Sequence, residues 1–244
     1  MTDIFGDLAA EYRQLDAVLA ALTPAQWSLP SAAEGWTVLD VVLHLAQTEE
    51  LVLASLAGHN TTFTPDRTDD VDSLAATFVA AERAIAPDDL LARWREAATA
   101  TPGALAGHPK DRRLSWVAGT LSPSTLATTR LAEHWAHAYD IVTPLAIDYP
   151  ATGRLRHIAW LGHRTLPYAF TVVGLTPEPV FCRLTSPDGD IWRYGDPAAP
   201  SHITGPAAEF CLVGARRLAP ADSTLKATGP HAAAALGVLR NYAV

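Results

Sequence analysis

Apolar residues recur every three or four positions through most of the first 145 residues of this 244-residue chain. This spacing is typical of helices that bury one face, so it constrains the fold more than any other feature. It predicts helices over residues 3–21, 38–56, 73–86, 87–100 and 122–143. Four of these are long enough to form a bundle. A polar loop is expected at 57–72 and irregular chain at 101–121.

Two local signals define where helices begin. Thr23-Pro24-Ala25-Gln26 has the pattern of a capping box with proline at the first helical position, which predicts a short helical turn. Thr37 is expected to be the N-cap of the helix that starts at Val38. Asp40 occupies the fourth place of that box and suits the positive end of the helix.

The pattern changes near residue 150. Helices are expected at 152–170, 206–217 and 231–242, and strands at 180–185, 190–194 and 223–228. The turn sequence Ser186-Pro187-Asp188-Gly189 joins the first two strands into a β-hairpin. We therefore predict an α+β protein with a helical bundle at 1–148 and a small mixed α/β domain at 149–244.

Charge and composition exclude several classes of partner. The net charge of −8, without a cluster of Lys and Arg, argues against nucleic-acid binding. No apolar stretch reaches the ~18 residues that a membrane-spanning helix needs. The N-terminal residues do not resemble a signal peptide, and two cysteines do not form a disulfide framework. A cytoplasmic protein without a membrane partner is expected.

Histidine and glutamate side chains fall on the inward side of two predicted helices. Glu133 and His137 are four residues apart and His134 and His137 three apart, so either pair lies on one helix face. His44, on another helix, could supply a further ligand. Two imidazoles and a carboxylate would hold zinc or ferrous iron and leave positions open. Spacing alone also allows ordinary hydrogen-bonded side chains in a core.

Four motifs resemble a known family. They are Trp27 to Pro30, Gly35-Trp36-Thr37-Val38, Asp40 with His44-Leu45-Ala46, and Glu133-x-Trp135-x-His137-x-x-Asp140. The chain is similar to the mycothiol-dependent maleylpyruvate isomerase family, within the DinB-like metal-binding four-helix bundles. Its last hundred residues resemble the sterol-carrier-like domain of that family. The resemblance implies that His44, Glu133 and His137 bind a divalent metal, zinc being preferred, although other DinB-like bundles use three histidines.

The resemblance also implies an activity. It indicates an actinobacterial metal-dependent enzyme that uses mycothiol, a small external thiol, for isomerisation or S-transfer on a small acidic or conjugated substrate. A metal-dependent hydrolase, lyase or cyclase that lacks the thiol is one alternative. A non-catalytic, metal-stabilised carrier of small molecules is another. A homodimer is possible.

Several further residues have expected roles. Cys182 and Cys211 fall in predicted elements of the second domain and are expected in its core, which fits an external thiol. Arg216 and Arg217 are candidates for catalytic residues that bind a substrate carboxylate, although arginine is favoured at an exposed helix end in any case. Asp140 could orient an imidazole or form a helix-end hydrogen bond to the Gly35–Thr37 loop, and Arg130 could pair with Glu133.

Overall fold

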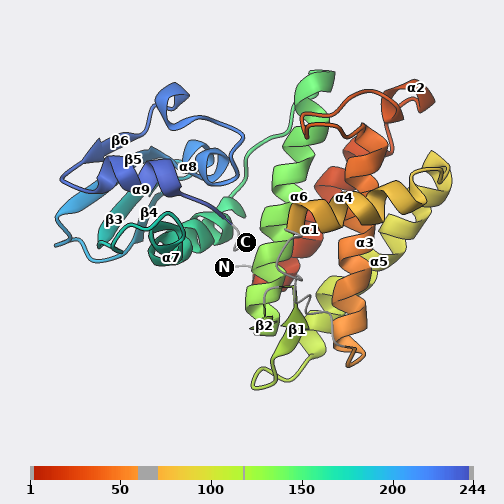
Figure 1. Ribbon diagram of the computed structural model, residues 1–244, viewed down its shortest axis with the longest axis horizontal. Coiled ribbons are helices and arrows are strands. Elements are labelled where there is room, and N and C mark those ends of the chain that lie inside the picture. The colour runs from red at the N-terminus through yellow and green to blue at the C-terminus, as the bar shows by residue number, and fades with distance from the viewer. Residues whose placement is uncertain (1–2, 60–70, 118, 242–244) are drawn as a thin grey trace. The chain divides into compact units, whose positions relative to one another are not determined.

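The computed structural model describes residues 3–59, 71–117 and 119–241 (Figure 1). It divides into two compact units, and the division falls between Tyr149 and Pro150. The first unit is mainly helical and the second combines helices with a four-stranded sheet. This composition confirms the predicted α+β fold. Residues 60–70 of the predicted polar loop lie outside the described residues.

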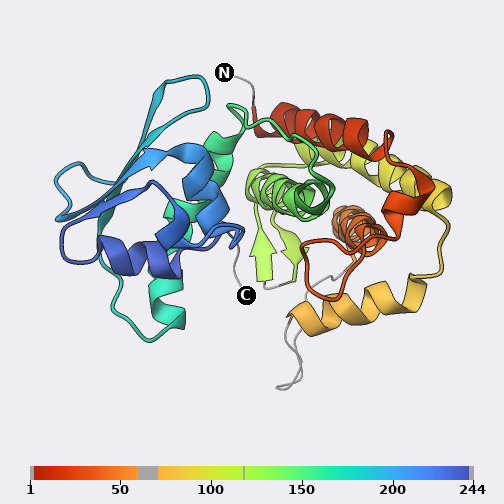
Figure 2. The ribbon, with the colours of Figure 1, turned by 90° about the horizontal axis from the view of Figure 1, so that it is seen from above.

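Four long helices form the body of the first unit. They are α1 (Ile4–Leu19), α3 (Val38–Leu56), α5 (Pro87–Gly107) and α6 (Pro123–Leu145), and they are accompanied by the shorter α2 (Pro24–Trp27) and α4 (Val71–Glu82). Figure 2 shows α3 and α6 nearly end-on, with α1 and α5 running along one side of them. Helices α3 and α6 both pack on α5 and on each other. Leu8, Leu45, Trp94 and Leu126 are among the side chains fully buried between them.

The start of α3 is fixed by local hydrogen bonds. The Thr37 hydroxyl accepts a hydrogen bond from the Asp40 amide at 3.2 Å, and the Asp40 carboxylate accepts one from the Thr37 amide at 2.9 Å. This reciprocal capping box is the one predicted, and it begins the helix at Val38. The register of every later side chain on α3 follows from that start.

The predicted irregular segment at 101–121 was wrong in two respects. Helix α5 continues through Pro102 to Gly107. Thr101, Pro102 and Leu105 are buried, and this packing offsets the cost of about 3 kcal/mol that a proline imposes inside a helix. Beyond α5, strands β1 (Leu114–Trp116) and β2 (Gly119–Leu121) form an antiparallel hairpin. Three-residue strands are too short to show a period in the sequence.

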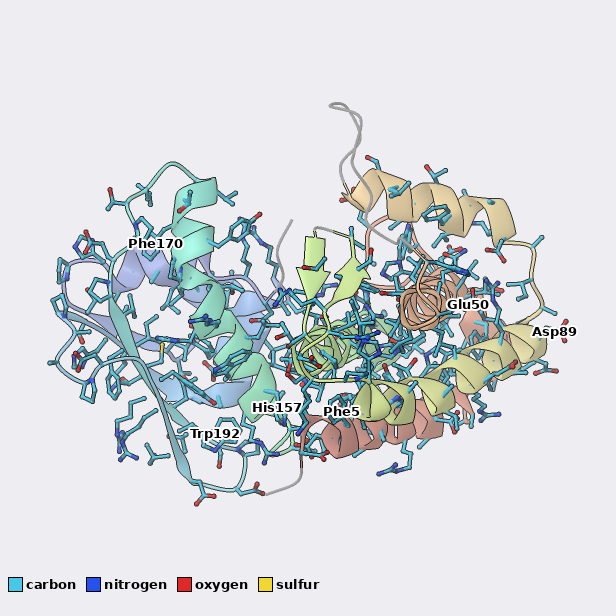
Figure 3. The ribbon with its side chains drawn as sticks, turned by 90° about the horizontal axis from the view of Figure 1, so that it is seen from below. Phe5, Glu50, Asp89, His157, Phe170 and Trp192 are labelled. Carbon is cyan, nitrogen blue, oxygen red and sulfur yellow. The ribbon has the colours of Figure 1, made fainter. Side chains whose placement is uncertain are left out.

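The second unit has a mixed sheet with strand order β4-β3-β5-β6. The strands are β3 (Val180–Thr185), β4 (Ile191–Tyr194), β5 (Ser201–Pro206) and β6 (Lys226–Thr228), and the helices are α7 (Leu155–Val172), α8 (Ala207–Gly214) and α9 (Ala232–Val238), with a 3₁₀ turn at Pro220–Asp222. Strands β3 and β4 form the predicted hairpin. Figure 3 labels Phe170, on α7, and Trp192, on β4; the Phe170 side chain is buried.

Strand β5 was not predicted. It pairs in parallel with β3 and occupies an inner position of the sheet. Its sequence, Ser201 to Pro206, carries a single aliphatic residue, Ile203, so alternation gave no signal. Gly205 has φ +144°, and a Cβ there would approach Leu225 at 3.0 Å. The helix predicted at 206–217 is shorter in the structure. Pro206 is the last residue of β5, and α8 runs from Ala207 to Gly214. None of the helices in the described residues is long and apolar enough to span a membrane.

Both cysteines lie in the core of the second unit, as predicted. Cys182 on β3 and Cys211 on α8 are fully buried and free. Burial raises the pKa of the Cys182 thiol to about 12 and also raises the pKa of Cys211. Neither side chain is therefore a thiolate at neutral pH.

We predict that neither cysteine of the folded protein reacts with Ellman's reagent at pH 8. A thiol with a pKa of about 12 is ionised to roughly one part in ten thousand at that pH, and burial also blocks the reagent. Urea-unfolded protein is the control and should release both thiols. Fast labelling of the folded chain would contradict this prediction.

Candidate metal centre

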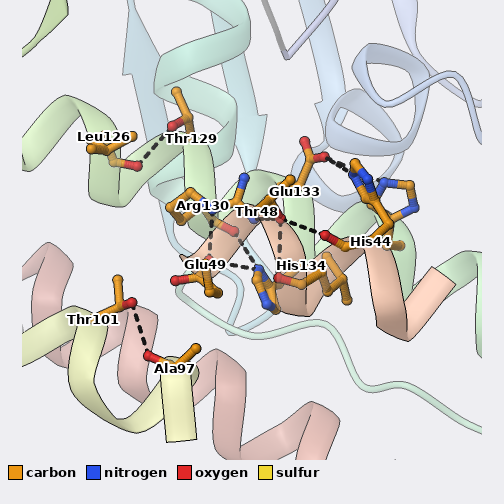
Figure 4. A network of polar contacts seen from close by, with 12 residues as sticks. His44, Thr48, Glu49, Ala97, Thr101, Leu126, Thr129, Arg130, Glu133 and His134 are labelled. Atoms are coloured by element: carbon orange, nitrogen blue, oxygen red, sulfur yellow. Dashed lines mark hydrogen bonds and ion pairs between the residues drawn. The ribbon is translucent and has the colours of Figure 1, made fainter. Parts of the chain in front are cut away.

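Two helices bring three potential metal ligands together. His44 lies on α3, and Glu133 and His137 lie one turn apart on α6. The His44 Nε2 atom is 3.0 Å from Glu133 Oε1, and the His137 Nε2 atom is 3.5 Å from the same oxygen. One ligand atom from each of the three residues lies within 4.8 Å of the others. Figure 4 shows the contact between His44 and Glu133.

The residues fit a divalent metal ion. The His44 and His137 side chains are 11% and 15% exposed, whereas the Glu133 side chain is 31% exposed. The cluster is therefore recessed, and Glu133 is its most exposed member. Two imidazole nitrogens and one carboxylate oxygen match the donor set of zinc and of non-haem ferrous iron in sites that keep open positions.

The charges within the cluster support one another. Burial by itself would raise the pKa of Glu133, but hydrogen bonds with His137 and His44 hold it well below its usual value. Burial would lower the pKa of His137, but Asp140 and Glu133 outweigh that effect and raise it to about 9. Burial lowers the pKa of His44. At neutral pH Glu133 is thus a carboxylate and His44 a neutral imidazole, the forms that bind metals, whereas His137 is protonated and must release one proton when a metal binds.

Asp140 connects this cluster to the chain before α3. Its Oδ2 atom lies 2.8 Å from His137 Nδ1, so it orients the ring with Nε2 toward Glu133. Its backbone oxygen accepts a hydrogen bond from the Ala32 amide at 2.9 Å. Of the two roles that the sequence left open for Asp140, the structure contains the contact with an imidazole, and the loop contact found is with Ala32, which lies before the Gly35–Thr37 segment.

His134 lies outside the cluster even though it is next to Glu133 in sequence. Its side chain is fully buried, the Trp94 indole donates a hydrogen bond to its Nε2 at 3.2 Å, and its Nδ1 lies 3.1 Å from the Arg130 carbonyl oxygen. Burial lowers the pKa of His134 well below its usual value. The ring is therefore neutral, and both of its nitrogens have partners away from the three ligands.

Behind the cluster lies a buried ion pair that the sequence did not indicate. Arg130 on α6 donates to the Glu49 carboxylate on α3 at 2.7 Å and to the Thr48 hydroxyl at 2.6 Å (Figure 4). The two charged side chains are 3% and 0% exposed. The prediction that Arg130 pairs with Glu133 was therefore wrong, because its hydrogen bonds go to Glu49 and Thr48. The charge of Glu133 still helps to raise the pKa of Arg130 against the effect of burial. The sequence signal that could have revealed the pair is that Glu49 and Arg130 each interrupt the apolar face of their helix.

Arg216 and Arg217 lie in the second unit, just beyond α8. Both are exposed, and Arg216 adopts a left-handed backbone conformation with φ +59°. Arg216 also lines a shallow hollow with Val213, Leu218 and Leu236. The Arg217 guanidinium donates to the Ala215 carbonyl oxygen at 2.6 Å.

These features define a class of protein: a helical bundle with a two-histidine, one-carboxylate cluster between two of its helices, followed by a mixed α/β unit. Residues 8–142 match the family model of the mycothiol maleylpyruvate isomerase N-terminal domain. The chain belongs to that family, as its motifs indicated.

The comparisons extend beyond the bundle. Two uncharacterized proteins from two strains of Mycobacterium tuberculosis are each 37% identical to this chain and cover 97% of it and 94% of their own length. A crystal structure of the mycothiol-dependent maleylpyruvate isomerase has a TM-score of 0.62 at 18% identity and covers 93% of this chain and 96% of its own. The structure of a histidine-to-alanine mutant of that enzyme has a TM-score of 0.60, with 88% and 92% covered. At this identity the likeness establishes the fold.

The buried pair gives a stability prediction. Arg130→Met should lower the free energy of unfolding by about 3–5 kcal/mol, because Glu49 would remain buried without its partner. The double substitution Glu49→Leu with Arg130→Met should recover most of that loss. Urea unfolding of chelator-treated protein measures both effects.

The exposed ion pair between Arg95 and Asp16 provides a matched control. Its side chains are 44% and 38% exposed, so Arg95→Met should cost no more than about 1 kcal/mol. If Arg130→Met costs no more than Arg95→Met, the Glu49–Arg130 pair is not a buried structural link in solution.

Proposed function

We propose that this protein is a metal-dependent enzyme that uses an external small thiol, mycothiol, to isomerise or S-transfer a small acidic or conjugated substrate. The observation that carries the proposal is the convergence of His44, Glu133 and His137 in a chain of this family. The relatives of known structure are named for mycothiol and maleylpyruvate, which makes these compounds the first pair to test.

The three converging side chains would hold the ion. A divalent metal such as zinc supplies Lewis acidity, which lowers the pKa of a thiol or polarises a substrate oxygen. Asp140 keeps a proton on His137 Nδ1 and so leaves Nε2 for the metal side. Glu133 is ionised before any ligand arrives and is the most exposed of the three. Zinc is the first metal to test because it accepts this donor set.

An external thiol accounts for the chemistry that the chain itself lacks. Cys182 and Cys211 are buried in the second unit with raised pKa values, so neither can act as the nucleophile. In the isomerisation, a thiolate sulfur bonds to one carbon of a conjugated double bond, and the π electron pair moves onto the conjugated carbonyl. The former double bond rotates, the electron pair returns, and the carbon–sulfur bond breaks. The thiolate is thereby released unchanged, and no proton is gained or lost overall.

The first test measures metal content and thiol dependence. Protein purified without chelator should contain about one equivalent of metal, and a folded His44→Ala/His137→Ala variant should contain none. The metal-loaded protein should convert maleylpyruvate only when mycothiol is present. The control variant His59→Ala/His231→Ala removes two histidines outside the cluster and should keep both metal and activity.

Each alternative gives a different result in this experiment. Folded wild-type protein that takes up none of the divalent metals offered would contradict the metal centre. Turnover without a thiol would identify a hydrolase, lyase or cyclase. Ligand binding that survives Glu133→Ala, without any turnover by the wild type, would identify a carrier.

We also propose that Arg216 or Arg217 binds the substrate carboxylate. Substituting the functional arginine with alanine should raise KM by roughly 10- to 100-fold, the usual loss for a hydrogen bond to a charged group. Lysine should restore little, because it cannot form the bidentate contact. Arg164→Ala, at another exposed position of the second unit, is the control. An unchanged KM in both alanine variants would contradict a role of Arg216 or Arg217 in substrate binding.

A further inference from the structure

The two histidines of the cluster are held in different ways. His137 has its second ring nitrogen, Nδ1, bound to Asp140. His44 uses Nε2 toward Glu133, and its Nδ1 forms no hydrogen bond with any residue in the described ranges. Metal-binding histidines are usually oriented by a hydrogen bond at the nitrogen that does not bind the metal. Besides the bond from Nε2 to Glu133, the contacts that can orient the His44 ring are therefore those with neighbouring rings.

Trp36 provides one such contact. Its ring centroid lies 5.2 Å from that of His44 with an interplanar angle of 53°, and 6.4 Å from that of His137 with an angle of 19°. The two imidazoles are 5.0 Å apart. All of these distances fall in the range in which aromatic rings attract each other. One half-buried indole thus packs against both histidines of the cluster.

The backbone holds Trp36 in this position. The Trp36 carbonyl oxygen accepts the Ser31 amide at 2.9 Å, and its own amide donates to the Ala33 carbonyl oxygen at 3.1 Å. Gly35 has φ +76°, a conformation that favours glycine just before the indole. This loop is also the segment whose Ala32 amide binds the Asp140 backbone. One loop therefore contacts both Asp140, which is bonded to His137, and the ring of His44.

We propose that Trp36 is a positioning residue for the metal centre, which orients the His44 imidazole by ring packing in place of a hydrogen bond at Nδ1. The inference rests on the metal site of the proposed function. A purely structural role would be different. Trp36 precedes the N-cap Thr37, a place where an apolar residue can stabilise a helix start by packing on the first turn. Such a role would affect the free energy of unfolding but not the metal.

The test compares Trp36→Ala, Trp36→Leu and Trp36→Phe with the wild type. Zinc affinity is measured by competition with a chromophoric chelator, and the visible absorption of the Co²⁺-loaded protein reports ligand geometry. Alanine and leucine should weaken zinc binding by about 10- to 100-fold and change the Co²⁺ spectrum, because His44 loses its orienting contact. Phenylalanine should restore both. Trp160→Ala, an indole 42% exposed in the second unit, is the matched control and should match the wild type.

The outcomes separate this inference from the proposed function. Wild-type protein that binds neither zinc nor cobalt would overturn the metal centre and this inference together. Normal binding by the wild type, with the same affinity and spectrum in folded Trp36→Ala or Trp36→Leu, would overturn the role of Trp36 alone. A lower urea midpoint without any change in metal binding would assign Trp36 to the helix start and would also overturn the inference.

Discussion

The buried ion pair between Glu49 and Arg130 connects the two helices that bring His44, Glu133 and His137 together. Glu49 lies five residues after His44 on α3, and Arg130 lies three residues before Glu133 on α6. Two charges removed from water are tolerable only when they face each other, because an unpaired buried charge costs several kcal/mol. Sliding α3 along α6 would separate this pair together with the contact between His44 and Glu133. The pair thus favours one register, the register that brings His44 to Glu133.

The front of the cluster depends on a different kind of link. The loop before α3 is fixed by the capping box of Thr37 and Asp40 and by the bond from Ala32 to the Asp140 backbone. These are hydrogen bonds at the start of α3 and to the backbone of α6, and the Asp40 carboxylate among them is buried and paired with Arg83 at 2.9 Å. The rear of the site is therefore set by an ion pair between two helices, whereas the front is set by a loop that is bonded to the start of α3 and to α6.

Local sequence signals predicted the elements but not the contacts between them. The capping box at Thr37 was predictable because all its partners lie within three residues. Spacing placed Glu133 and His137 on one helix face and left His44, which is 89 residues away, as a candidate from another helix; the family resemblance then selected these three as the ligand set. The Glu49–Arg130 pair spans 81 residues, and the parallel pairing of β5 with β3 is also non-local. Neither leaves a periodic signal in the chain.

The exposure of the cluster bears on the kind of metal site that His44, Glu133 and His137 would form. Structural zinc sites are usually closed by four protein ligands, whereas reactive sites keep a position open. Among the described residues three donors converge here. The helix face behind them is sealed, since His134 is fully buried and bonded to Trp94, while the Glu133 side chain remains 31% exposed. A buried rear, a partly exposed Glu133 and three converging donors fit an open metal position better than a closed four-ligand site. Because both cysteines are buried elsewhere, any sulfur nucleophile would have to come from an external thiol.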